Sequence, residues 1–144
     1  MTLTLYTGTD TTELAIVTTA SAQDQQKQRI LSAVGIDGDQ LPLVDEETLF
    51  RYFEYLSKNL SLPFTAHYPE PTNPLEKDQF KCSVLELLDP SKFVGDHFDG
   101  IFCKTRKAGF EVNLPLIELE VSEDSPNSQL IEDYWYWFWN WRCR

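Results

Sequence analysis

The spacing of apolar residues predicts two helices in the first part of the chain. Apolar positions between residues 12 and 34 fit a helix of moderate amphipathicity, which Gly35 would end. A clearer helix is predicted over residues 45–60, because its apolar residues recur at spacings of four, three and four. These residues are Leu49, Phe53, Leu56 and Leu60. Leu62-Pro63 limits any continuation of this second helix.

After Pro63 the apolar residues alternate with polar ones, which predicts a series of short strands. The strands are expected at residues 64–68, 80–87, 101–106, 110–114 and 116–121. The residues between the third and fourth strands, Lys107-Ala108-Gly109, suit a hairpin connection. Five short antiparallel strands would leave two open edges, so the pattern favours a small curled barrel.

A last helix is predicted from Ser125-Pro126 to residue 141, because a capping residue followed by proline is typical of a helix start. Ile131, Trp135, Phe138 and Trp141 would share one face of this helix. The four tryptophans stand at every second position and also match a strand period, so the start signal decides in favour of the helix.

Together these elements predict an α+β fold, a small, bent, SH3-like antiparallel β-barrel packed with N-terminal and C-terminal helices. Residues 1–43 are rich in Thr and Gln and have no aromatic residue after Tyr6. We expect them to form a helical N-terminal extension, and residues 44–144 to form the α+β domain that carries the function.

The charge balance narrows the classes of partner. The 144 residues include 23 Asp and Glu against 12 Lys and Arg, which gives a net charge of −11. Such a field repels nucleic acids and anionic membranes, so neither is expected as a partner. No apolar run approaches the roughly 20 residues that span a bilayer, and the N-terminus does not read as a secretory signal. Three widely spaced cysteines fit a reducing, cytoplasmic environment.

Catalysis is poorly supported by the sequence, so we do not expect an enzyme. His67 and His97 are the only histidines, and neither lies in a nucleophile or zinc-protease motif. Nucleotide-binding glycine motifs are missing as well. A metal-dependent hydrolase that uses Asp96, His97 and Asp99 remains an alternative.

Acidic residues cluster where basic residues are missing, and this pattern favours a bound cation. No basic residue occurs between Arg29 and Arg51, between Lys92 and Lys104, or between Lys107 and Arg142. Calcium suits irregular clusters of carboxylates, whereas zinc and copper prefer nitrogen and sulfur ligands. Two alternatives stay open: a solvated acidic surface, and an acidic module that docks on a basic protein partner without a metal.

The calcium site would not be an EF-hand. Asp37-Gly38-Asp39 opens like an EF-hand loop, but Leu41 and Thr48 stand where that loop needs ligands. Any calcium site must therefore be assembled from distant segments.

Three segments in this order resemble the cyanobacterial calcium-binding CcbP family: VDEETLFRYFEYLSKNLSLPFTA at 44–66, PLIELE at 115–120 and DYWYWFWN at 133–140. The resemblance covers roughly residues 44–141. It implies a protein without enzymatic activity that binds Ca²⁺ and buffers or reports cytosolic calcium in signalling linked to heterocyst differentiation. It is also compatible with a regulatory protein partner of unknown identity.

The candidate calcium ligands rest on the resemblance and on charge. The resemblance carries over the acidic opening of the second helix, the acid that closes PLIELE and the acid before the aromatic cluster: Asp45, Glu46, Glu47, Glu120 and Asp133. Charge and spacing alone add four more: Asp37, Asp39, Asp96 and Asp99. We expect one or more ions between the acidic helix start, the acidic loop after Phe93 and the acidic stretch near the C-terminus.

Overall fold

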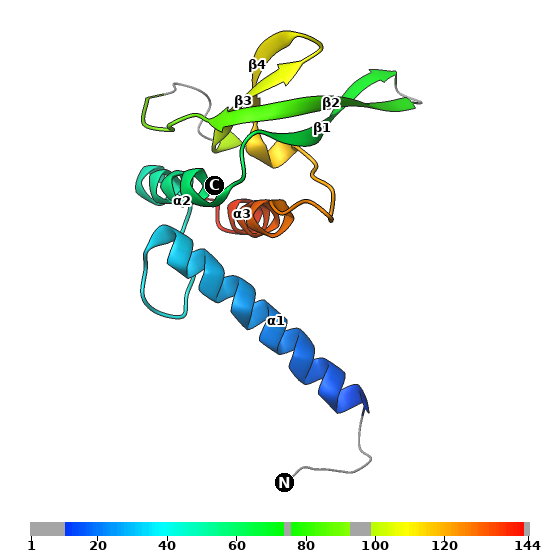
Figure 1. The fold of residues 1–144 in the computed structure, drawn as a ribbon. Helices are drawn as coiled ribbons and strands as arrows, with labels where there is room; N and C mark the ends of the chain where they lie inside the picture. The colour runs from blue at the N-terminus through cyan, green and yellow to red at the C-terminus, as the bar shows by residue number, and fades with distance from the viewer. Residues whose placement is uncertain (1–10, 74–75, 93–98, 143–144) are drawn as a thin grey trace.

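Three α-helices and four β-strands make up the protein, in an α+β arrangement (Figure 1). The computed structural model describes residues 11–73, 76–92 and 99–142. In chain order the elements are α1 (Thr11–Val34), α2 (Glu46–Asn59), β1 (Phe64–Asn73), β2 (Glu76–Leu87), β3 (Phe102–Lys107), β4 (Phe110–Pro115), the 3-10 turn η2 (Leu116–Glu118) and α3 (Ser128–Asn140). The three predicted helices and the first four predicted strands are confirmed, but β1 continues to Asn73 instead of ending at residue 68, and β2 begins at Glu76 instead of residue 80.

Helix α2 begins with a capping box. The Asp45 carboxylate accepts a hydrogen bond from the Thr48 amide at 2.8 Å, and the Thr48 hydroxyl accepts one from the Asp45 amide at 2.9 Å. These bonds satisfy amides that the first turn leaves without a partner inside the helix. One face of the helix is buried, with Leu49, Tyr52 and Leu56 in the core.

The four strands form one antiparallel sheet in the order β1-β2-β3-β4. Alternation along the strands points Ala66, Cys82, Val84, Cys103 and Thr105 into the core. Helices α2 and α3 lie below this face, and α1 lies beyond them (Figure 1). The sheet is open, so the predicted SH3-like barrel is not confirmed.

The predicted fifth strand at 116–121 is wrong for most of its length. After Pro115 the chain turns through η2, and only Glu120 reaches the free edge of β1. There the amides and carbonyls of His67 and Glu120 pair in both directions at 2.8 Å. The tight turn takes the chain away from the sheet, so one bridge replaces a strand.

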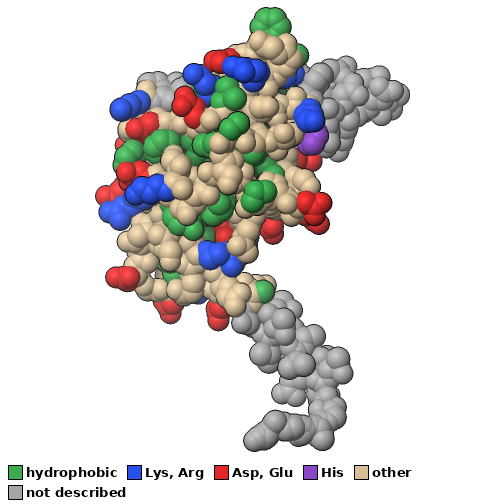
Figure 2. All heavy atoms as spheres, viewed as in Figure 1, with side chains coloured by type: hydrophobic (Ala, Val, Ile, Leu, Met, Phe, Trp, Pro, Cys, Tyr) green, Lys and Arg blue, Asp and Glu red, His purple; other side chains and the backbone are tan. Residues whose placement is uncertain are grey.

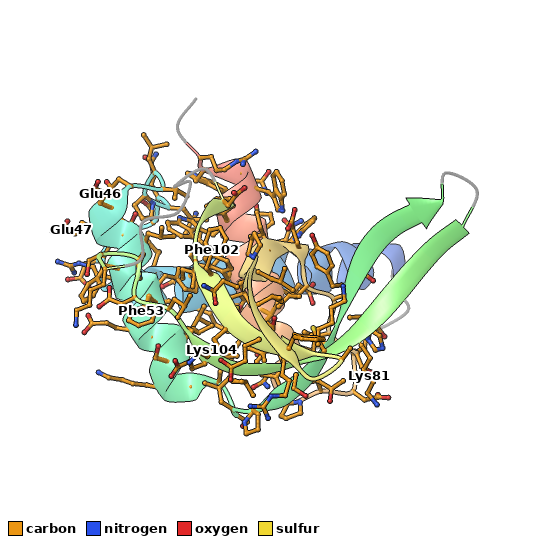
Figure 3. The ribbon with its side chains drawn as sticks, turned by 90° about the horizontal axis from the view of Figure 1, so that it is seen from above. Glu46, Glu47, Phe53, Lys81, Phe102 and Lys104 are labelled. Atoms are coloured by element: carbon orange, nitrogen blue, oxygen red, sulfur yellow. The ribbon has the colours of Figure 1, made fainter. Side chains whose placement is uncertain are left out.

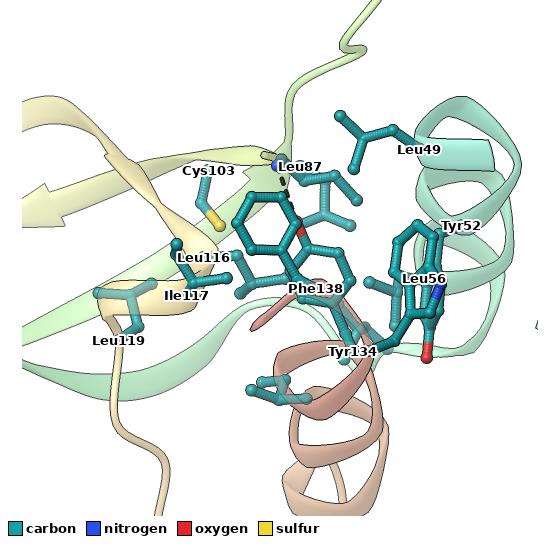
Figure 4. Close-up of a cluster of buried hydrophobic side chains, with 14 of the residues drawn as sticks. Leu49, Tyr52, Leu56, Leu87, Cys103, Leu116, Ile117, Leu119, Tyr134 and Phe138 are labelled. Atoms are coloured by element: carbon teal, nitrogen blue, oxygen red, sulfur yellow. Dashed lines mark hydrogen bonds between the residues drawn. The ribbon is translucent and has the colours of Figure 1, made fainter. Parts of the chain in front are cut away.

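The core beneath the sheet is strongly aromatic. Tyr52, Tyr134 and Phe138 are almost completely buried (Figure 4). Trp137 is buried as well, and its ring stacks on that of Tyr52 with the centroids 5.0 Å apart. The expected buried face of α3 was partly wrong, because Trp135 is 49% exposed and Tyr134 and Trp137 are buried in its place. The segment is therefore a helix, in which burial follows the helical period, although its tryptophans stand at every second position.

The end of α1 belongs to the core. Ile30, Leu31, Ala33 and Val34 are buried against α2 and α3, although they fall within the predicted extension. The boundary at residue 43 stays a prediction, since the packing shows only where the helix docks. In the ranges that the structure describes, no helix combines the length and the apolar character needed to cross a membrane.

Candidate metal centre

The acidic residues in the loop before α2 and in its first turn are exposed to solvent. Asp37 and Asp39 are exposed in the loop that follows α1. Glu46 and Glu47 project outward from the start of α2 (Figure 3), and Glu47 lies 3.9 Å from Arg51. The Asp45 carboxylate already serves the capping box described above. As metal ligands these five residues stay predictions.

Asp133 is buried and already has a cationic partner. Its carboxylate accepts hydrogen bonds from Arg29 at 2.7 and 3.1 Å and from Gln26 at 3.0 Å. The hydrogen bond from Arg29 to this carboxylate raises the pKa of the guanidinium. Asp133 therefore fastens α3 to α1, and its predicted role as a metal ligand remains untested.

The charge of Asp99 acts on Glu118, a residue that the sequence analysis did not name as a ligand. Asp99 directly precedes the buried Gly100, and Glu118 ends η2. The two segments are joined by a hydrogen bond from the Leu116 amide to the Ile101 carbonyl at 2.9 Å. Partial burial, and then the charge of Asp99, raise the pKa of Glu118. The charge of Asp99 thus adds to the cost of ionising Glu118.

A hollow of about 370 Å³ lies beside Glu118. It is lined by Tyr68, Ile117, Glu118, Leu119, Glu120 and Trp135. The predicted ligand Glu120 therefore shares this hollow with Glu118. Two other residues with a predicted role, Asp96 and His97, lie outside the described residues.

Acidic side chains are otherwise dispersed. On the face seen in Figure 2 they are spread over the surface and do not gather in one patch. Among residues 11–73, 76–92 and 99–142, no three side chains of His, Cys, Asp or Glu are grouped so that they could hold a metal ion. The described residues therefore do not assemble a metal site by themselves, and Asp99 and Glu118 are candidates for part of one.

The cysteines give no sign of a soft-metal or nucleophilic site. Cys82 and Cys103 are free and buried. Burial raises the pKa of both thiols, which disfavours the thiolate needed for metal binding or attack. These two residues confirm the expectation of free structural thiols, and Cys143 lies outside the described residues.

The raised pKa of Glu118 leads to a prediction about stability without calcium. The folded state binds this proton more tightly than the unfolded state, so ionising Glu118 disfavours folding. Glu118→Gln should therefore raise the free energy of unfolding at neutral pH by less than about 1 kcal/mol, since the group is exposed to solvent screening. The gain should vanish below the ordinary pKa of 4.5.

Urea unfolding in a chelator at neutral and acidic pH measures this difference. Glu132→Gln, an exposed change on α3, is the matched control for loss of one negative charge. A Glu118→Gln protein that is less stable than the wild type at neutral pH would contradict the assignment.

Two solved structures share this fold. The crystal structure of Anabaena CcbP aligns with a TM-score of 0.57 and 18% identity, over 78% of this chain and 88% of that one. A structure described as a calcium binding protein in the calcium-binding form aligns with a TM-score of 0.60 and 16% identity, over 84% of this chain and 94% of that one. At such identities the likeness establishes the fold.

Family membership comes from the sequence match. A direct search with the sequence finds no match among curated proteins. The family Calci_bind_CcbP, described as "Calcium binding", matches residues 28–138. The match covers well over half of the chain and includes the last turns of α1, which the resemblance did not reach. This protein is therefore a member of the CcbP calcium-binding family.

Proposed function

We propose that this protein binds Ca²⁺ and acts as a calcium buffer or sensor, without catalysing a reaction. Its family is described by calcium binding, and the two similar structures are of calcium-binding proteins and not of enzymes. Its cytosolic role, and the link to heterocyst differentiation, rest on the resemblance to cyanobacterial family members.

The family match over residues 28–138 is the observation that carries this proposal, and the effect of the Asp99 charge on Glu118 is the basis for choosing these two carboxylates as ligands. Both are hard oxygen donors, which calcium prefers. Neither forms an ion pair with another described residue, and the charge of Asp99 raises the pKa of Glu118. A calcium ion held by these two carboxylates would remove that repulsion. The site would lie outside the EF-hand pattern, because its ligands come from two segments that are distant in sequence.

The other predicted ligands differ in whether their carboxylates are already engaged. Asp45 and Asp133 have structural partners, so we assign them to the stability of the fold. Glu120, which lines the hollow with Glu118, is proposed as a further ligand, and Asp96, outside the described residues, stays a prediction. The exposed carboxylates at 37, 39, 46 and 47 are proposed as a weaker outer site.

Calcium binding should stabilise the folded protein. For a calcium sensor the dissociation constant is roughly 10⁻⁷ to 10⁻⁵ M. At a hundredfold excess over that constant, calcium should raise the free energy of unfolding by about 2.7 kcal/mol. Calorimetric titration in excess magnesium at fixed ionic strength gives the affinity, and urea unfolding with and without a chelator gives the stabilisation.

Two variants locate the ion. Asp99→Asn with Glu118→Gln should weaken calcium binding at least about tenfold, or 1.4 kcal/mol. Asp37→Asn with Asp39→Asn removes the same charge from the exposed loop and should retain most of the affinity. The proposal of calcium binding fails if the wild type gives no heat and no stabilisation beyond that of added salt. Equal losses in both double variants would instead refute the assignment to Asp99 and Glu118.

A further inference from the structure

The main chain of Ile101 is held from two sides by other elements of the fold. Its amide donates a hydrogen bond to the Tyr134 hydroxyl of α3 at 2.9 Å (Figure 4). Its carbonyl accepts one from the Leu116 amide of η2, also at 2.9 Å. Ile101 is completely buried, so water can replace neither partner unless the structure opens locally. These two bonds therefore fix the chain at Ile101 relative to both α3 and η2.

The two proposed calcium ligands belong to the segments that meet at Ile101. Asp99 stands two residues before Ile101, and Glu118 is the last residue of η2. A Cβ atom at Gly100, which separates Asp99 from Ile101, would meet the Tyr134 hydroxyl. Helix α3 therefore also limits how the residue next to Asp99 can lie. The position of Asp99 relative to η2 thus depends on one hydroxyl of α3.

Packing of α3 against α2 holds the Tyr134 hydroxyl in place. The Tyr134 side chain is completely buried, and its ring meets the Tyr52 ring of α2 edge-on, with centroids 5.2 Å apart. On its own helix it packs against the Phe138 ring, with centroids 5.9 Å apart. Burial raises the pKa of the hydroxyl, so it stays neutral and brings no charge to the site. Its effect on nearby residues comes from its hydrogen bond and from its shape.

We propose that Tyr134 is a positioning residue for calcium binding, because its hydroxyl fixes the segment of Asp99 relative to Glu118 through the main chain of Ile101. The proposal rests on the proposed calcium function and on the choice of these two carboxylates as ligands. It adds that the affinity depends on the packing of α3, which supplies neither of them. Groups that bond directly to a metal ligand typically change the affinity by about 10–100-fold. Tyr134 acts one step further away, so its expected effect is smaller.

Hydrogen exchange in a chelator tests the positioning bond in the absence of calcium. Tyr134→Phe removes one oxygen atom and leaves the ring, so the Ile101 amide loses its partner while the packing is retained. Exchange of this amide should become at least about tenfold faster. Thr105→Val is the matched control, because it removes another completely buried hydroxyl, which donates to the Val112 carbonyl at 2.8 Å. An Ile101 amide that exchanges no faster in Tyr134→Phe than in Thr105→Val would overturn the proposal.

Calorimetric titration with calcium then measures the effect on binding. Tyr134→Phe should weaken calcium binding about fivefold, whereas Thr105→Val should bind calcium like the wild type. Equal losses in the two variants would mean that the affinity follows overall stability, and they would overturn the proposal. Unchanged affinity in Tyr134→Phe would overturn it as well.

A double-mutant cycle with Asp99→Asn identifies the residue through which Tyr134 acts. In the Asp99→Asn background, Tyr134→Phe should lower the affinity by less than about twofold, because the ligand that it positions is already altered. A full fivefold loss in that background would contradict the role assigned to Tyr134. A wild type that binds no calcium would refute the proposed function and the positioning role together. A wild type that binds calcium no more tightly than Tyr134→Phe would refute the positioning role alone.

Discussion

Arg29→Met is expected to lower the free energy of unfolding by about 2–4 kcal/mol, because it leaves a buried carboxylate without its counter-charge. The Asp133 side chain is only 6% exposed and receives two hydrogen bonds from the guanidinium. Among the described residues, Gln26 would remain as its donor. Arg29 is itself one-third exposed, so water can partly replace it, and this places the loss below that of a fully buried pair.

Urea unfolding followed by tryptophan emission measures the free energy of unfolding of Arg29→Met. Two further variants serve as controls. Arg29→Met combined with Asp133→Leu removes both charges and should recover most of the stability, since apolar side chains of similar size tolerate burial without partners. Arg106→Met breaks the exposed contact with Glu111 at 3.3 Å and should change stability by less than about 1 kcal/mol. If Arg29→Met lowered the stability by no more than Arg106→Met does, the ion pair between Arg29 and Asp133 would not hold α1 to α3.

Local signals in the sequence sufficed to locate most of the elements. The cap at Asp45 and the three-and-four spacing of apolar residues identify α2, because each signal depends on residues that lie close together in the sequence. Alternation identifies the first four strands for the same reason. Whether the sheet closes depends instead on the path of the chain after Pro115, and the turn of η2 was not visible in the alternation of PLIELE.

Contacts between distant segments account for the errors at the candidate site. Asp133 looked like a free acid because its partner, Arg29, lies 104 residues earlier in the chain. Glu118 was passed over because its segment is joined to that of Asp99 by a hydrogen bond from the Leu116 amide to the Ile101 carbonyl, which the sequence does not reveal. Asp99 could be proposed from charge alone, since it lies in a stretch without basic residues. The sequence therefore indicated the acidic segments but not which carboxylates meet.

Gly100→Ala is expected to lower the free energy of unfolding by about 3–5 kcal/mol. The residue has a φ of +74°, in the left-handed region, where an alanine costs about 1–2 kcal/mol. A Cβ atom there would also meet the Tyr134 hydroxyl and lie 2.7 Å from a ring carbon of Phe138, and such overpacking costs about 1–3 kcal/mol more. The same hydroxyl accepts a hydrogen bond from the Ile101 amide at 2.9 Å (Figure 4), so the side chain cannot move without breaking it.

Gly109→Ala separates the two causes, because Gly109 also has a positive φ, +86°, but an added Cβ would have no atom within 4 Å. Its loss should be limited to the backbone strain of about 1–2 kcal/mol. Equal losses in the two variants would mean that the close approach of Gly100 to α3 contributes nothing. Where Gly100→Ala still folds, the displaced loop should move Asp99 away from Glu118 and weaken calcium binding, whereas Gly109→Ala should bind calcium like the wild type. Calorimetric titration of both variants therefore tests whether this glycine holds the proposed ligands together.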